Sequence, residues 1–209
     1  MIKKVIFDLD NTLIDWLDEY IFAITNVINK LNLGYSENKI KEIDNKLTDY
    51  EKTHTIYDKR DFCDYLNKEC NTNLPYEFVD MLIEEQGKCY REFKESEIDT
   101  LEYLKSKYEL IVLSNWFTDT QIKRLENAKV LKYFSLVSGG DRHLLKPAKE
   151  AFDIVDKKSE CVMVGDSIKH DIMPAIELGM KAILITKKQV KEDSRYIKIE
   201  KLEELKEIL

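Results

Sequence analysis

Five short, mostly apolar runs recur along the chain, and each ends near a polar residue or a glycine. They lie at residues 4–9, 109–113, 135–137, 161–164 and 182–185. Nearly continuous apolar runs are typical of strands that are covered on both faces, as in a parallel sheet. The pattern therefore predicts a parallel sheet built from these strands.

Between most of these runs, apolar residues recur at the three- and four-residue spacing of an amphipathic helix. This spacing occurs within residues 98–104, 122–125, 151–155 and 168–176. Ser96 suits an N-cap, and Gly179 suits the left-handed residue that ends a helix. The alternation of strands and helices predicts an α/β fold with a doubly wound parallel sheet.

The long segment 16–94 interrupts this alternation, because its apolar residues show only helical spacing. They include Leu17, Tyr20, Ile24, Ile28, Ile40, Leu47, Phe62, Cys70, Phe78, Leu82, Cys89 and Phe93. Breaks near residues 34–36, 53–58 and 71–75 divide the segment into about four helices. We predict an α/β core formed by residues 1–15 and 95–209, and a helical bundle, the cap, formed by residues 16–94. The cap follows the first strand, where α/β sheets bind ligands, so it could act as a lid; a purely stabilising role is the alternative.

Composition and charge narrow the classes of function. A formal net charge of −7 argues against a dedicated nucleic-acid binder, which needs clustered Lys and Arg. No run reaches the roughly 18 to 20 apolar residues that cross a bilayer. Asp8 and Asp10 interrupt the apolar N-terminus too early for a signal peptide. We predict a cytoplasmic protein without nucleic-acid or membrane partners, whose cysteines, lacking C-x-x-C spacing, are reduced and structural.

Carboxylates gather where two of the apolar runs end. Asp8 and Asp10 lie two positions apart, so on an extended backbone they point to the same side, with origins roughly 6.6 Å apart. Asp166 and Asp171 follow a later run, in "VMVGDSIKHD". The carboxyl ends of parallel strands share one edge of a sheet, so we expect these carboxylates to converge. Crowded carboxylates require a hard cation with oxygen ligands, and Mg²⁺ fits best.

Groups that can bind phosphate follow the other runs. "LIVLSN" ends with Ser114 and Asn115, and "LLKP" places Lys146 before Pro147, which suits the first turn of a helix. A hydroxyl, an ammonium group, backbone N–H groups and Mg²⁺ would together stabilise a transferring phosphoryl group. The sequence therefore predicts phosphoryl-transfer chemistry on a small phosphate ester.

Taken together, these motifs resemble those of the haloacid dehalogenase superfamily, whose members are mostly phosphatases. The motifs occur in order as D-x-D-x-T at Asp8, Asp10 and Thr12, a hydroxyl at Ser114, a lysine at Lys146, and G-D-S-x-x-x-D at residues 165–171. The resemblance covers nearly the whole chain, including a helical cap inserted after the first motif. Position 11 is Asn where Gly is frequent, and position 114 is Ser rather than Thr; neither change removes a functional group.

The resemblance implies a role for each motif residue. Asp8 would be the nucleophile that forms an aspartyl-phosphate, and Asp10 the general acid that protonates the leaving alcohol and then activates water. Because these roles need opposite protonation states, we expect Asp10 to lie among carboxylates, away from the metal. The remaining assignments are Thr12, Ser114, Asn115 and Lys146 to the loop and the phosphate, Asp8, Asp166 and the backbone carbonyl of Asp10 to Mg²⁺, and Asp171 to support of the metal or Lys146.

The leading hypothesis is a Mg²⁺-dependent phosphatase that acts on a small phosphorylated metabolite. A sugar-phosphate mutase of the same superfamily and a catalytically weak regulatory or binding relative are the alternatives. A haloacid dehalogenase is less favoured, because it has no use for the acid–base group at Asp10. The sequence indicates neither the substrate nor the oligomeric state.

Overall fold

The computed structural model describes residues 1–16 and 19–209 of the chain. In these residues a sheet of six parallel strands has the order β3-β2-β1-β4-β5-β6. The strands are β1 (Lys4–Phe7), β2 (Glu109–Leu113), β3 (Leu136–Ser138), β4 (Cys161–Gly165), β5 (Lys181–Ile185) and β6 (Ile197–Ile199). The predicted doubly wound parallel sheet is confirmed. The edge strand β6 was not predicted, because it is only three residues long and two of them are exposed.

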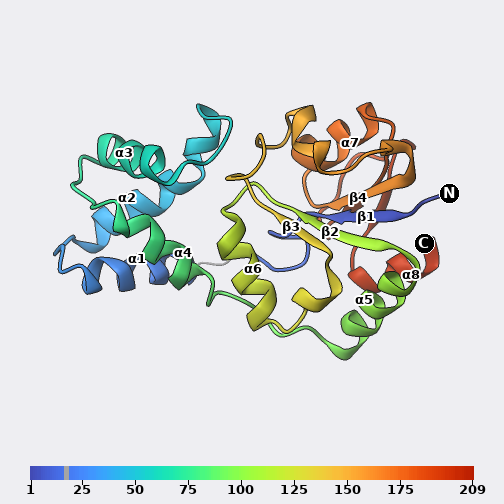
Figure 1. Cartoon of the computed structure of the whole chain (residues 1–209), viewed down its shortest axis with the longest axis horizontal. Coiled ribbons are helices and arrows are strands. Elements are labelled where there is room, and N and C mark those ends of the chain that lie inside the picture. The colour runs from blue at the N-terminus through green and yellow to red at the C-terminus, as the bar shows by residue number, and fades with distance from the viewer. Residues whose placement is uncertain (17–18) are drawn as a thin grey trace.

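Alternate residues of the strands face opposite sides of the sheet, and both sides are covered. Val5 and Phe7 pack in the hydrophobic cluster beneath α5 (Glu95–Lys107), α6 (Thr118–Asn127) and α8 (Leu205–Ile208). Ile6 packs on the other side, in the cluster that includes α7 (Met173–Glu177). Figure 1 shows α5 and α8 on one side of the sheet and α7 on the other. Burial on both faces explains why the strands are apolar at successive positions.

The helices predicted within the core are present, but two of them are not regular α-helices. Residues 151–155 belong largely to a 3₁₀-helix, η3 (Lys149–Ile154), and residues 168–176 form a π-helical turn, η5 (Ile168–Ile172), followed by α7. Pro147 precedes η3, in a turn where the Ala148 N–H donates to the Leu145 carbonyl over 3.0 Å. The remaining short 3₁₀-helices are η1 (Asp49–Lys52), η2 (Leu131–Tyr133), η4 (Lys158–Glu160) and η6 (Leu202–Glu204).

Of the two helix-end residues singled out in the sequence, one is confirmed. Ser96 is not an N-cap: α5 begins at Glu95, and the Glu97 carboxylate accepts a 2.8 Å hydrogen bond from the Lys94 N–H, which makes Lys94 the capping position. Gly179 adopts the left-handed conformation, with φ of 80°, just after α7. A residue without a Cβ adopts this conformation at little cost.

Segment 16–94 contains the helices α1 (Glu19–Lys30), α2 (Glu37–Leu47), α3 (Lys59–Cys70) and α4 (Glu77–Gln86). Their apolar faces form a hydrophobic cluster beside the sheet, and Trp116, Phe117 and Leu145 of the core belong to the same cluster (Figure 1). The predicted breaks carry helix-end signals: Ser36 and Asp58 cap α2 and α3 through their side chains, and Asn71 ends α3 with φ of 48°. Leu17 lies outside the described residues.

Residues 87–94 connect α4 to α5 outside any helix or strand, so helical spacing was misleading at Cys89 and Phe93. A Cβ at Gly87 would come within 2.7 Å of the Lys123 side chain, which shows how closely this connection approaches α6. Among the described helices, none is long and apolar enough to cross a membrane. Cys63, Cys70 and Cys161 are buried free thiols, and burial raises the pKa of the first two to about 11.

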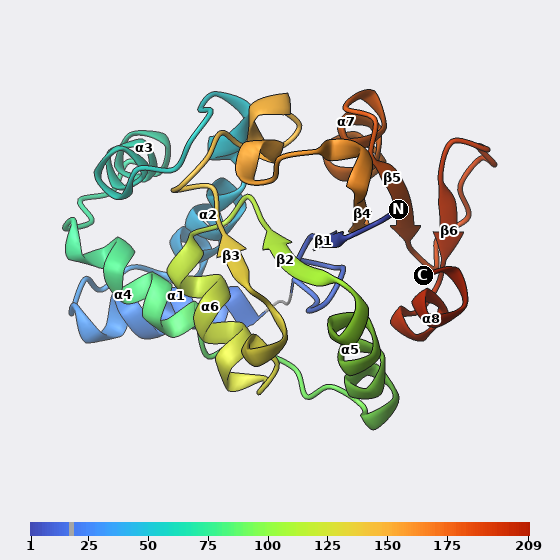
Figure 2. The same cartoon turned by 45° about the vertical axis from the view of Figure 1, so that its right-hand side comes forward.

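The helical segment contacts the core through backbone and side-chain hydrogen bonds. The Tyr57 N–H donates to the Gly140 carbonyl over 2.7 Å, and the Leu145 N–H donates to the Thr55 carbonyl over 2.8 Å. Figure 2 shows α4 next to α6, in agreement with their residue contacts. The helical segment therefore lies over the loops that follow β2 and β3, which also carry site residues. The domain boundaries at residues 15/16 and 94/95 stay predictions.

Candidate active site

The site lies where the direction of the strand order changes. The chain runs from β1 outward to β2 and β3, and then crosses to β4 on the other side of β1. Such switch points are where open α/β sheets bind ligands. A cavity of about 450 Å³ opens there, lined by Asp8, Asp10, Asn11, Trp16, Thr48, Glu51, Ser114, Asn115, Trp116, Lys146, Asp166, Ser167, His170 and Asp171. The structure thus brings nearly all the predicted site residues together; Thr12 lies just behind the lining.

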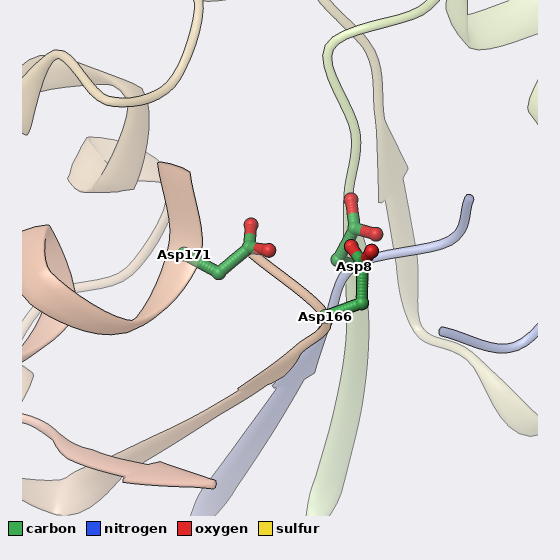
Figure 3. Close-up of side chains that lie close together, drawn as sticks. All are labelled: Asp8, Asp166 and Asp171. Carbon is green, nitrogen blue, oxygen red and sulfur yellow. The ribbon is translucent and has the colours of Figure 1, made fainter. Parts of the chain in front are cut away.

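The carboxylates of Asp8, Asp166 and Asp171 converge, with one oxygen of each lying within 4.8 Å of the others. Figure 3 shows that they come from three segments: the end of β1, the end of β4 and the turn of η5. The Asp8 N–H donates to the Val164 carbonyl over 2.9 Å, which keeps the residue beside β4. Convergence follows from the neighbouring positions of β1 and β4 in the parallel sheet.

Lys146 supplies positive charge to this cluster. Its Nζ donates to Asp8 Oδ1 over 2.7 Å and to Asp171 Oδ1 over 2.5 Å, and all three residues are buried. Burial alone would lower the pKa of Lys146, but the facing carboxylates of Asp171 and Asp8 raise it. Lys146 is therefore held as an ammonium group between two carboxylates.

One ammonium group leaves the three carboxylates short of positive charge. Burial raises the pKa of Asp8 despite the opposing charge of Lys146, and burial raises that of Asp166 to about 6, with Asp171 adding to the effect. A donor set made only of oxygens, with excess negative charge, suits a hard divalent cation such as Mg²⁺. The residues present therefore fit the metal predicted from the sequence.

The loop after β1 holds Asp8 from the other side. Thr12 Oγ1 donates to Asp8 Oδ2 over 3.1 Å, so Thr12 orients this carboxylate from behind the cavity lining. Asn11 adopts φ of 61°, in the left-handed region. Asparagine tolerates that region better than most residues, which explains how it can stand where glycine is frequent.

Asn115 positions Lys146 through its side-chain amide. Its Oδ1 accepts from the Lys146 N–H over 2.8 Å, and its Nδ2 donates to the Lys146 carbonyl over 2.9 Å. Nδ2 also donates to Glu51 Oε2 over 2.8 Å. Asn115 thus connects the Lys146 backbone with a carboxylate from η1 of the helical segment.

Gly165 allows Asp171 to approach β4 closely. A Cβ at this position would lie 2.5 Å from Asp171 Oδ2, so any larger residue would displace the carboxylate. The same oxygen accepts from the Ser167 N–H over 3.0 Å. The glycine of the G-D-S motif is therefore required by a side-chain contact.

The sequence led us to expect Asp10 among carboxylates, and this expectation was wrong. Arg124 Nη1 donates to its Oδ1 over 2.5 Å, and Gln121 Nε2 donates to its Oδ2 over 2.6 Å. The Arg124 side chain is fully buried. Burial opposes its charge, but the facing Asp10 carboxylate more than offsets this and raises the pKa of Arg124.

Ser114 completes the surroundings of Asp10. Its Oγ accepts from Gln121 Nε2 over 2.7 Å and from the Trp116 N–H over 3.2 Å, and lies 3.5 Å from Asp10 Oδ2. The hydroxyl itself donates to Asp10 Oδ2 in that long contact, and a phosphate oxygen in the cavity can take the place of this acceptor. This arrangement suits the predicted contact with phosphate.

Sequence reasoning missed Gln121, Arg124, Thr48 and Glu51. Gln121 and Arg124 are three positions apart on α6, and Arg124 precedes the buried Leu125. An arginine on the apolar face of a predicted helix was the signal that could have identified this pair. Thr48 and Glu51 belong to a helix end and a short 3₁₀ turn, where the spacing of apolar residues does not predict which way a side chain points.

The two tryptophans of the chain, Trp16 and Trp116, form part of the cavity wall. Their ring centroids are 5.4 Å apart in an edge-to-face arrangement. Trp116 Nε1 donates to Gln86 Oε1 of α4 over 2.9 Å. This aromatic pair lies where the helical segment meets the core.

The comparison with known families agrees with this geometry. The family model of haloacid dehalogenase-like hydrolases matches residues 5–185. The chain belongs to this family. The resemblance inferred from the motifs, and with it the prediction that the protein is an enzyme, are confirmed at the level of the family.

The individual relatives of this haloacid dehalogenase-like hydrolase have low sequence identity to it. The N-acylneuraminate-9-phosphatase of Rattus norvegicus is 28% identical over 207 residues, covering 87% of this chain and 81% of that protein. The magnesium-bound structure of the HAD-hydrolase YfnB from Bacillus subtilis superposes with a TM-score of 0.74 at 19% identity, covering 99% and 98% of the two chains. The L-2-haloacid dehalogenase of Xanthobacter autotrophicus superposes with a TM-score of 0.70 at 16% identity, covering 100% and 98%. These structures share the fold of this hydrolase.

Proposed function

We propose that this hydrolase is a Mg²⁺-dependent phosphatase that acts on a small phosphorylated metabolite through an aspartyl-phosphate on Asp8. The observation that carries the proposal is the buried bridge from Lys146 to Asp8 and Asp171, beside a third carboxylate at the sheet's switch point. It combines a nucleophile, a fixed positive charge and a set of oxygen ligands in one cavity.

Asp8, Asp166 and the backbone carbonyl of Asp10 would hold the metal, with Asp171 beside them. When bound, Mg²⁺ would neutralise charge on the phosphate oxygens. The protein's own positive charge and hydrogen-bond donors for the phosphate are Lys146 Nζ and the Ser114 hydroxyl. Binding of phosphate would replace part of the contact that Lys146 now makes with Asp8.

The two aspartates divide the reaction between them. A carboxylate oxygen of Asp8 attacks phosphorus, a new oxygen–phosphorus bond forms, and the bond to the ester oxygen breaks. Asp10, in its protonated form, gives its proton to that departing oxygen. Asp10 then takes a proton from a water molecule, which attacks the phosphorus of the aspartyl-phosphate and restores the Asp8 carboxylate as phosphate leaves.

We also propose that residues 16–94 act as a cap that selects the leaving group. Thr48 and Glu51, both from this segment, line the same cavity as Asp8. Glu51 is held by Asn115 and is a hydrogen-bond acceptor for hydroxyl groups of a substrate. Closure of the cap would exclude bulk water from the phosphoryl group.

The test is a panel of phosphorylated metabolites and p-nitrophenyl phosphate, assayed for phosphate release with Mg²⁺ and with a chelator. N-acylneuraminate 9-phosphate belongs in the panel, because it is the substrate named for the rat relative. We expect phosphate release to depend on Mg²⁺. The values of kcat/KM then rank the metabolites as substrates. A protein that releases no phosphate from any of them would refute the proposal, and chromatography that finds an isomerised sugar phosphate would favour a mutase.

A further inference from the structure

The fully buried guanidinium of Arg124 contacts both segments that connect the core with helices α1 to α4. Its Nη2 donates to the Asp15 carbonyl over 3.1 Å, on the segment that leaves the core. Its Nε donates to the Cys89 carbonyl over 2.8 Å, on the segment that returns from α4 to α5. One side chain on α6 therefore touches the chain where it enters and where it leaves the helical segment.

The remaining nitrogen of the same group, Nη1, contacts Asp10. It donates to Asp10 Oδ1 over 2.5 Å and to Gln121 Oε1 over 2.9 Å. Gln121 in turn donates to the other Asp10 oxygen. The Asp10 carboxylate is thus held at both oxygens by a pair of α6 side chains.

The guanidinium is planar, so its donors keep fixed directions relative to one another. Arg124 is fully buried, and water cannot readily replace a protein partner that moves away. A displacement of residue 15 or 89 must therefore shift the guanidinium or break one of its hydrogen bonds. Either change alters the hold on Asp10.

We propose that Arg124 is a positioning residue that holds the Asp10 carboxylate in its working orientation only while both connecting segments keep the arrangement seen here. The proposal rests on the phosphatase function proposed above. It makes proton transfer by Asp10 depend on the position of the cap. A substrate that keeps the cap from closing would then bind, but Asp10 would protonate its leaving oxygen poorly.

The experiment compares two esters that differ in their need for a proton. The leaving group of p-nitrophenyl phosphate is an acidic phenol that departs readily as an anion, whereas glycerol 2-phosphate loses an alcohol that requires protonation. General acid catalysis contributes about 10²- to 10⁴-fold. We expect Arg124→Lys, which keeps the charge but not the planar donors, to lower kcat/KM, which reports formation of the aspartyl-phosphate, at least about tenfold more for glycerol 2-phosphate than for p-nitrophenyl phosphate.

Arg91→Lys is the matched control. Arg91 lies on the same returning segment and donates to the Leu13 carbonyl over 3.0 Å, but its other hydrogen bonds are to Glu92 and Glu97 rather than to Asp10. Its replacement should change kcat/KM for both esters by the same factor. If Arg124→Lys also lowers kcat/KM equally for both esters, the positioning role is refuted. Inactivity of the unmodified protein on both esters would instead refute the phosphatase proposal.

Two further measurements keep the proposal testable if Arg124→Lys does not fold. Gln121→Met removes one hydrogen bond to Asp10. It should give the same preference for p-nitrophenyl phosphate over glycerol 2-phosphate, but a smaller one. Hydrogen exchange of residues 87–94 should be faster in Asp10→Asn than in the unmodified protein, because coupling between sites is reciprocal. Unchanged exchange, or a Gln121→Met variant without the preference, would overturn the proposal.

Discussion

Asp8 and Asp10 belong to one loop, yet the surroundings of the two side chains differ in kind. Asp8 lies with two other carboxylates and one ammonium group, in a region that needs further positive charge. Asp10 lies in a region already balanced by a buried guanidinium and supported by an amide. The comparison indicates that the chemical role of an aspartate is set by the elements packed against it more than by its place in a motif.

The largest expected effect is on the Asp8 side. Asp8→Asn removes the nucleophile, and we expect turnover of every phosphate ester to fall by about 10⁴-fold or more, as for other covalent nucleophiles. Asp99→Asn, which changes an exposed carboxylate on α5, is the control and should retain full activity. Steady-state phosphate release decides the matter; an active Asp8→Asn variant would end the proposed mechanism.

The second prediction concerns Asp10. Asp10→Asn keeps the shape of the side chain but removes its proton transfer, so turnover of alkyl phosphates should fall about 10²- to 10⁴-fold. The aspartyl-phosphate from p-nitrophenyl phosphate should still form, because a phenol departs without help. A rapid burst of p-nitrophenol followed by slow turnover would be the signature. Equal losses in the burst and in turnover would mean that the two aspartates do not divide the reaction.

The third prediction separates the two regions by metal binding. Mg²⁺ at about 100 times its Kd should stabilise the protein by roughly 2.7 kcal/mol, because it binds the folded state. Asp166→Asn should lose most of this stabilisation, while Glu51→Gln, a change in the same cavity but away from the carboxylate cluster, should keep it. Thermal unfolding with Mg²⁺ and with a chelator measures the difference. Stabilisation retained by Asp166→Asn would remove this residue from the metal site.

The smallest expected effect comes from backbone spacing. Gly165→Ala would place a Cβ 2.5 Å from Asp171 Oδ2 and push that carboxylate away from Lys146. We expect a loss of about 1–3 kcal/mol of folding stability, the usual cost of overpacking. Gly34→Ala, in the helical segment, is the comparison variant. Its Cβ would meet no atom within 4 Å, so a loss of stability there would come from the left-handed φ of 66° and not from overpacking. Chemical denaturation that finds Gly165→Ala as stable as the parent would show that Asp171 can yield without cost.

The motif residues were predictable because parallel strands end at a common edge. Asp8, Ser114 and Asp166 each follow an apolar run, so a sheet of the predicted kind must bring their loops together. The four cap helices were predictable for a related reason, since their breaks carry capping residues such as Ser36 and Asp58. In both cases the signal is local and the geometry follows from regular structure.

The partners of Asp10 were not predictable in the same way. Whether Arg124 faces solvent or a buried carboxylate depends on how α6 packs against the loop after β1, a contact between residues 114 positions apart. Glu51 reaches the cavity through the packing of a 3₁₀ turn, and β6 is too short for its pattern to be recognised. These features depend on tertiary contacts that neither spacing nor propensity encodes.

The pairing of Trp16 with Trp116 gives the protein a built-in optical reporter. These are the only two tryptophans of the sequence, and both line the cavity. The tryptophan fluorescence of the chain therefore originates at the junction between the helical segment and the core. Ligand entry or rearrangement at that junction will change the emission of the native protein without any attached label.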